Sequence, residues 1–76
     1  MTDTPTTEQI AAHYTSMGHS VELINSIRAG NAIIGLNTSE ERQSCIDRNV
    51  GHLEIMVAKD YWTTEDMTAV NAAIAG

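Results

Sequence analysis

The sequence predicts an all-α fold, a small bundle of three to four helices in one domain that spans residues 1–76. Apolar residues recur at intervals of three and four, which is the helical period. Threonines are followed three residues later by Gln or Asp, a pattern typical of helix starts. Glycines separate the periodic segments. The expected helices cover about residues 5–17, 20–29, 39–61 and 64–75, and an apolar connector covers residues 31–37.

Two helices are expected before the connector, with a break at Gly18. Thr6 and Gln9 have the capping-box spacing, so the first helix should begin beside them. Gly18 is suited to the left-handed residue that often follows a helix, because it has no Cβ. The second helix should then run to Gly30, which is again suited to a helix end.

The connector is rich in apolar residues and has two possible conformations. Ile33, Ile34 and Leu36 could form a short strand, but no second strand is visible to pair with it. An apolar loop pressed onto the helices is therefore the favoured interpretation. In the alternative, its edge pairs with a neighbouring subunit.

The third helix has the strongest periodicity and should be the longest. It should start at Thr38 or Ser39, with acidic residues in its first turn, where they complement the helix dipole. At 1.5 Å per residue, residues 39–61 would extend about 33 Å. Gly51 in its middle costs about 1 kcal/mol relative to alanine, which suggests either close approach of another backbone or a tolerated weak point. A heptad-like seam follows its length: Ile46, Val50, Leu53, Val57 and Tyr61.

The last helix has a clear start. Thr63 and Asp66 have the capping-box spacing, and Trp62 before them could pack on Met67 as a hydrophobic staple. The chain should therefore turn sharply at Trp62. The third and fourth helices would then pack together as a C-terminal helical hairpin.

Charge and hydropathy exclude several kinds of partner. The net charge is −6, and the longest apolar run is much too short to cross a bilayer, so neither nucleic acid nor a membrane is an expected partner. The acidity has two interpretations, ordinary solubility or mimicry of DNA toward a basic protein, and solubility is favoured. The four basic residues are dispersed along the chain: Arg28, Arg42, Arg48 and Lys59.

The side chains that could support catalysis do not occur in productive patterns. Cys45 and His52 are seven residues apart, so on a straight helix they lie about 10 Å apart, too far for a thiolate–imidazole pair. His13 and His19 lack the spacing of a metal-binding pair, although a site formed by all three histidines is conceivable. We therefore expect no enzyme activity, no cofactor, no metal and no small-molecule substrate.

A chain of 76 residues buries only about 60–65% of the surface of its unfolded form. A single cysteine rules out an internal disulfide and accords with synthesis in a reducing cytoplasm. We therefore expect apolar residues to stay exposed on the monomer and to contact other proteins, including copies of the same chain. The expected interface residues are Ile33, Ile34, Leu36, Val50, Leu53, Val57, Tyr61, Trp62 and Met67.

One segment resembles a known group of proteins. Residues 48–63, RNVGHLEIMVAKDYWT, with the closing residues 72–76, AAIAG, resemble small uncharacterised proteins encoded by tailed bacteriophages. The resemblance implies a structural accessory protein of a virion, such as a tail or head adaptor or a cement subunit. It would be made in the host cytoplasm and would pack against other virion proteins. The alternative is a small acidic phage-encoded inhibitor that binds a host protein.

Overall fold

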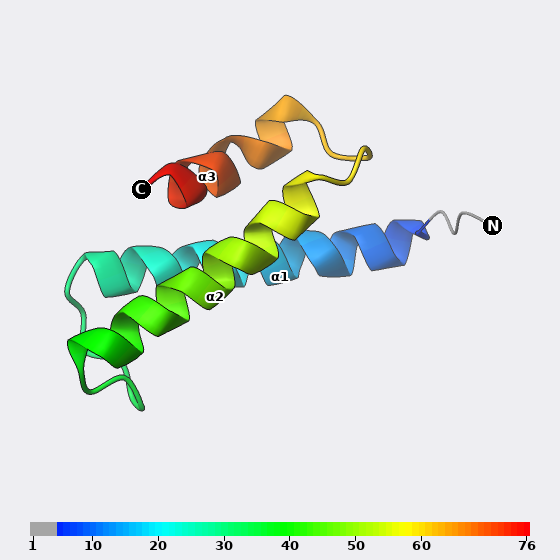
Figure 1. Cartoon of the computed structure of the whole chain (residues 1–76). Helices are drawn as coiled ribbons and strands as arrows, with labels where there is room; N and C mark the ends of the chain where they lie inside the picture. Colours follow the sequence, from blue (N-terminus) through cyan, green and yellow to red (C-terminus); the bar gives the residue numbers. More distant parts are fainter. Residues whose placement is uncertain (1–4) are drawn as a thin grey trace.

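A computed structural model describes residues 5–76 and confirms the all-α fold class. Its helices are α1 (Thr7–Arg28), α2 (Ser39–Val57) and α3 (Thr64–Ala75). Figure 1 shows α2 crossing α1 and α3 folding back over α2 after a sharp turn. The described part of the chain therefore contains three helices, and α1, with 22 residues, is the longest, where the sequence had suggested the third of four.

Each helix begins with a capping box. In α2 the Thr38 hydroxyl accepts from the backbone N–H of Glu41 at 3.0 Å, and the Glu41 carboxylate accepts from the backbone N–H of Thr38 at 3.0 Å. Thr6 with Gln9 and Thr63 with Asp66 form the same reciprocal pair at the starts of α1 and α3. Because each box satisfies two backbone donors that the helix itself cannot pair, these three sites fix where the helices begin.

The predicted break at Gly18 is wrong, since α1 continues through it without interruption. The buried residues of α1 lie on one unbroken helical stripe on both sides of the glycine: Met17, Ser20, Val21, Ile24 and Ile27. Packing this stripe against the other helices outweighs the roughly 1 kcal/mol that a glycine costs inside a helix.

The end of α1 is fixed by a Schellman motif and by a side chain from α2. Gly30 has φ +85°, and the backbone N–H groups of Gly30 and Asn31 donate to the carbonyls of Ile27 and Ser26 at 3.0 and 3.1 Å. The Arg42 guanidinium donates to the carbonyls of Ile27 and Asn31 at 3.1 and 2.8 Å. The first turns of α2 are thereby tied to the last turn of α1.

The connector between α1 and α2 makes a tight turn. The backbone N–H of Leu36 donates to the carbonyl of Ile33 at 3.1 Å, and these two residues form an isolated antiparallel bridge. Gly35 has φ +90°, a conformation that side chains with a Cβ rarely adopt. Ile33 and Leu36 pack against the core, as the favoured interpretation of this segment required.

α2 ends at Val57, four residues before the predicted end at residue 61. The Trp62 indole donates to the carbonyl of Met56 at 2.9 Å, and the backbone N–H of Lys59 donates to the same oxygen at 3.1 Å. In a continuing helix that carbonyl would accept from the N–H of residue 60. Capture of the Met56 carbonyl by the indole therefore ends α2 and sets the corner that leads into α3.

The core lies where the three helices meet. The buried apolar residues are Met17, Val21, Ile24, Ile27, Cys45, Ile46, Leu53, Met56, Met67, Val70 and Ala73. Arg28 of α1 donates to the carbonyl of Ala73 in α3 at 2.6 Å. The molecule is elongated, with extents of 43 × 21 × 18 Å and a Cα radius of gyration of 13.7 Å.

Candidate protein-binding surfaces

The residues predicted to form a protein interface are distributed between the core and the surface. Leu53 and Met67 are buried, with exposed fractions of 0% and 6%, so the prediction is corrected at these two positions. The seam of the predicted third helix could have formed either the core or an interface, but its inner residues pack within the chain. Ile34 is fully exposed. The others are partly exposed. Tyr61 packs against Trp62, and the rest pack against the core: Ile33, Leu36, Val50, Val57 and Trp62.

Ile34 is the most exposed apolar side chain in the described part of the chain, with a relative exposure of 104%. It occupies the second position of the four-residue turn 33–36. Ile33 and Leu36 on either side pack against the core, so the turn that carries Ile34 is held in place. An isoleucine presented on an anchored turn loses little conformational entropy when a partner covers it.

An aromatic corner forms where α1 meets the loop between α2 and α3. We define it as Tyr14, Tyr61 and Trp62 together with His13. The Trp62 ring centroid lies 4.7 Å from that of Tyr61 and 6.1 Å from that of Tyr14, both in tilted geometry. Such tilted pairs add about 0.5–1.5 kcal/mol beyond the area that they bury. Tyr14 is nevertheless 51% exposed, so the corner presents an aromatic edge to solvent.

His13 and Tyr61 were not predicted to meet. The His13 Nδ1 lies 3.2 Å from the Tyr61 hydroxyl across 48 positions of sequence. This contact joins the first half of α1 to the corner. The only signal in the sequence is that residues 10, 13, 14 and 17 share one face of a helix, which does not identify the element that contacts them.

A groove of about 210 Å³ runs between α1 and α3 beside this corner. Its floor is apolar, with Met17, Val21 and Val70 among the residues that line it. Two carboxylates, Glu22 from α1 and Asp66 from α3, lie along it, and Tyr14 forms a wall. Apolar floor, aromatic wall and carboxylates together suit a basic side chain with an apolar neighbour.

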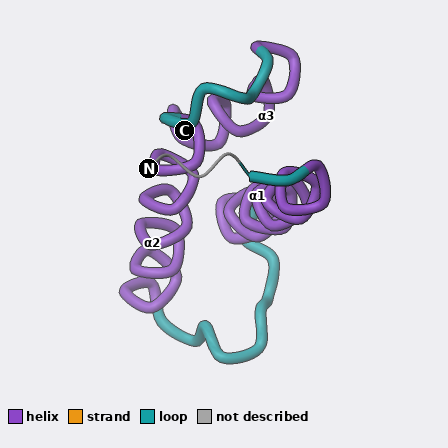
Figure 2. Tube along the Cα trace, turned by 90° about the vertical axis from the view of Figure 1, so that its right-hand side faces the viewer, coloured by secondary structure: helices purple, strands orange, loops and turns teal. Residues whose placement is uncertain are grey.

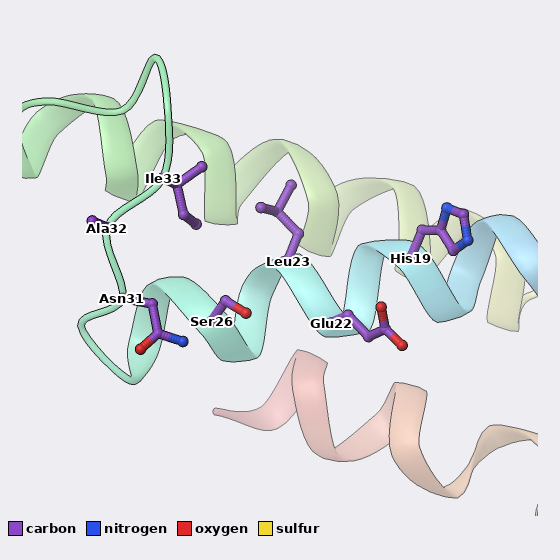
Figure 3. A pocket seen from close by; sticks show the side chains of 7 residues that line it. All are labelled: His19, Glu22, Leu23, Ser26, Asn31, Ala32 and Ile33. Atoms are coloured by element: carbon purple, nitrogen blue, oxygen red, sulfur yellow. The ribbon is translucent and has the colours of Figure 1, made fainter.

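A second depression of about 510 Å³ lies between α1 and the connector. Figure 3 shows Leu23 of α1 facing Ile33 of the connector, with His19 farther along α1 and Glu22 on another side of the helix. Glu22 lines both this depression and the α1–α3 groove. The depression is wide and mixed in polarity, which suits surface contact rather than enclosure of a small ligand.

The side chains that could react or bind a metal are not clustered. Cys45 is buried in the core, where Asn49 donates to its carbonyl at 2.8 Å and its Sγ lies 3.5 Å from the same amide nitrogen. Within residues 5–76, no three side chains of His, Cys, Asp or Glu come close enough together to hold a metal ion. None of the helices in that range has the length and apolar composition needed to cross a bilayer.

Compared with protein-family models, curated proteins and solved structures, the chain matches none of them. The resemblance of residues 48–63 to proteins of tailed bacteriophages therefore stays a prediction.

Proposed function

We propose that this protein is a non-catalytic structural accessory protein that acts by packing against other protein chains, and that its setting is a bacteriophage virion. The observation that carries the packing role is Ile34, which is held fully exposed on a turn whose flanking residues are anchored in the core. The virion setting is supported by the resemblance of residues 48–63.

The elongated shape supports the same role. The accessible surface is 5359 Å², against about 4,500 Å² for a compact monomer of 8.2 kDa. The exposed surface includes the aromatic edge of Tyr14, which lines the apolar groove beside it. Contiguous apolar and aromatic surface of this kind marks protein interfaces more often than catalytic sites.

Mass spectrometry of purified particles of the encoding phage tests the setting. We expect the chain at a stoichiometric copy number. Particles that assemble normally without it and never contain it would contradict the virion role.

A pair of variants tests whether the turn that carries Ile34 contacts other virion proteins. Ile34→Glu places a charge at the exposed tip and should reduce incorporation into particles by about tenfold or more, since burying an unpaired carboxylate is strongly unfavourable. Ser39→Glu adds the same charge at the exposed first residue of α2, where it complements the helix dipole, and should incorporate normally. Equal incorporation of both variants would show that the Ile34 turn is not the contact.

One observation favours the second candidate function, an acidic inhibitor of a host protein. Glu40, Asp47 and Glu54 are exposed and lie seven residues apart on α2, so they share one face at intervals of about 10 Å. Regular carboxylates can imitate a row of phosphates. Copurification of the chain with a nucleic-acid-binding host protein, lost on replacing all three with the corresponding amides and unaffected by Ile34→Glu, would select this function over the virion role.

A further inference from the structure

The basic residues of the chain fall into two groups. Arg28 and Arg42 bind backbone carbonyls inside the fold. Arg48 and Lys59 are exposed, and within residues 5–76 they make no such internal bond. In a chain of net charge −6, the two cations that stay available for a partner are therefore both on or just after α2.

These two cations flank an exposed apolar side chain. Arg48, His52 and Ile55 follow one another at steps of four and three, so they share one face of α2, and Lys59 comes two residues after the helix ends. Ile55 is 64% exposed. We call these four residues the α2 stripe.

The α2 stripe is complementary to the α1–α3 groove. The groove has an apolar floor for Ile55, and the carboxylates of Glu22 and Asp66 and the ring of Tyr14 for the two cations. The helical part of the stripe also agrees with the groove in length. Arg48 to Ile55 spans about 10 Å along α2, and Tyr14 to Glu22 spans about 12 Å along α1.

The two surfaces lie on different sides of the molecule, so they cannot meet within one chain. Figure 2 shows α2 on one side, with α1 and α3 beside it. The stripe residues are exposed and so point away from the packed faces of α2. The groove is formed by the two other helices.

We propose that the α2 stripe of one copy docks into the α1–α3 groove of a second copy. Because the two surfaces lie on different sides of the chain, we expect the contact to repeat head-to-tail into a ring or an open array, rather than to close as a reciprocal two-fold dimer. This inference rests on the proposed packing function and names one of its partners. Because a single stripe is smaller than a standard interface, an isolated contact should have a Kd of about 0.1–1 mM and become stable only in a repeated array.

Two variants that each disable one surface provide the test. Ile55→Glu removes the stripe and keeps the groove, whereas Ala69→Arg fills the groove and keeps the stripe, since Ala69 lines the groove from an exposed position on α3. Sedimentation at about 1 mM protein and about 0.15 M salt, where the Debye length is about 8 Å, limits repulsion between the acidic copies. We expect wild-type chain to exceed twice its 8.2 kDa mass, and each variant alone to stay at that mass.

Mixing the variants tests whether the stripe of one copy binds the groove of another. Each variant retains one working surface, so an equimolar mixture should form a dimer of twice the chain mass and nothing larger. Ala72→Arg adds the same charge on α3 at an exposed position outside the groove lining and should assemble as wild type does. A monomeric wild type at about 1 mM, or a mixture that stays monomeric, would overturn the inference.

Ile34→Glu separates this inference from the proposed function. Ile34 belongs to neither the stripe nor the groove, so self-association should persist in that variant while particle incorporation falls. If the wild type is monomeric but enters particles in an Ile34-dependent manner, the self-contact fails and the packing function stands. If it neither self-associates nor enters particles, both fail.

Discussion

Trp62 makes both ring contacts and a hydrogen bond at the corner between α2 and α3. Its ring packs against Tyr61 and Tyr14, and its indole N–H donates to the Met56 carbonyl that would otherwise extend α2. The sequence predicted Trp62 as a staple before the capping box of α3. Its hydrogen bond to the preceding helix was not predictable, because it depends on the path of the loop between α2 and α3.

Truncation of Trp62 should therefore destabilise the fold through both packing and hydrogen bonding. The side chain is half-buried, so Trp62→Ala should lower the free energy of unfolding by about 2–4 kcal/mol, below the range for a fully buried tryptophan. Trp62→Phe keeps most of the ring contact and loses the hydrogen bond, so about 1 kcal/mol is expected. Because the wild type is itself expected to be stable by only about 2–4 kcal/mol, urea denaturation followed by circular dichroism in a stabilising osmolyte measures both losses. Equal losses for the two variants would show that the hydrogen bond, and not the ring, holds the corner.

Arg42 is the second residue whose role depends on long-range geometry. It donates to two carbonyls at the end of α1 from its position near the start of α2. Arg42→Ala should lower the free energy of unfolding by about 1.5–3 kcal/mol, since charge-assisted bonds to a helix C-terminus are lost. Arg48→Ala removes an equal charge from an exposed site and should change it by less than about 0.5 kcal/mol at dilute protein. Thermal melts of both at low concentration provide the comparison, and equal effects would contradict the capping role.

At the scale of helices and turns, two glycines have opposite effects on stability: Gly51 weakens a helix, and Gly30 allows a helix to end. Gly51 lies within α2 with open space where a Cβ would stand. Of the two interpretations of this glycine, close approach of another backbone and a tolerated weak point, the described chain shows the second. Gly51→Ala should therefore raise the free energy of unfolding by up to about 1 kcal/mol. Gly30→Ala should lower it by about 1 kcal/mol, because φ there is +85°. Denaturation midpoints that move in the same direction for both variants would contradict this assignment.

The starts of the helices were readable from sequence because capping is local. Thr6 with Gln9 and Thr63 with Asp66 were identified by spacing alone, and the Thr38–Glu41 box follows the same pattern. The ends of helices were harder to predict. Gly18 and Gly30 are equally suited to a helix end by residue type. Buried residues continue at the helical period after Gly18, so α1 continues through it, whereas they stop before Gly30.

The candidate surfaces were less predictable than the helices, because they depend on contacts between elements that are distant in sequence. Periodicity identifies apolar faces but does not say which neighbour covers them. Leu53 and Met67 lie on such faces and are covered within the chain, whereas Ile34 is left exposed by a turn that no periodic pattern reports. The α1–α3 groove combines residues about fifty positions apart, so its carboxylates and floor became adjacent only in the folded molecule.

At the scale of the whole molecule, shape limits stability. The radius of gyration of 13.7 Å exceeds the roughly 11 Å expected for a compact domain of 76 residues. α1 alone extends about 33 Å, so part of it lies beyond the region where the three helices meet. Its first two turns are mostly exposed, with Ile10 and His13 only partly covered. A thin core shared by three helices leaves apolar surface that association with another chain can bury.

The isolated chain should therefore fold cooperatively but weakly. We expect a single unfolding transition with a free energy of about 2–4 kcal/mol in dilute solution, near the lower limit for small domains, because one shared core stabilises all three helices. Trp62 fluorescence reports the corner and circular dichroism reports the helices, and the two urea curves should coincide. A partner present at 100 times its Kd should add about 2.7 kcal/mol. A free energy above about 6 kcal/mol at micromolar protein would show that the chain needs no partner to complete its core, and this would remove the physical basis for a packing role.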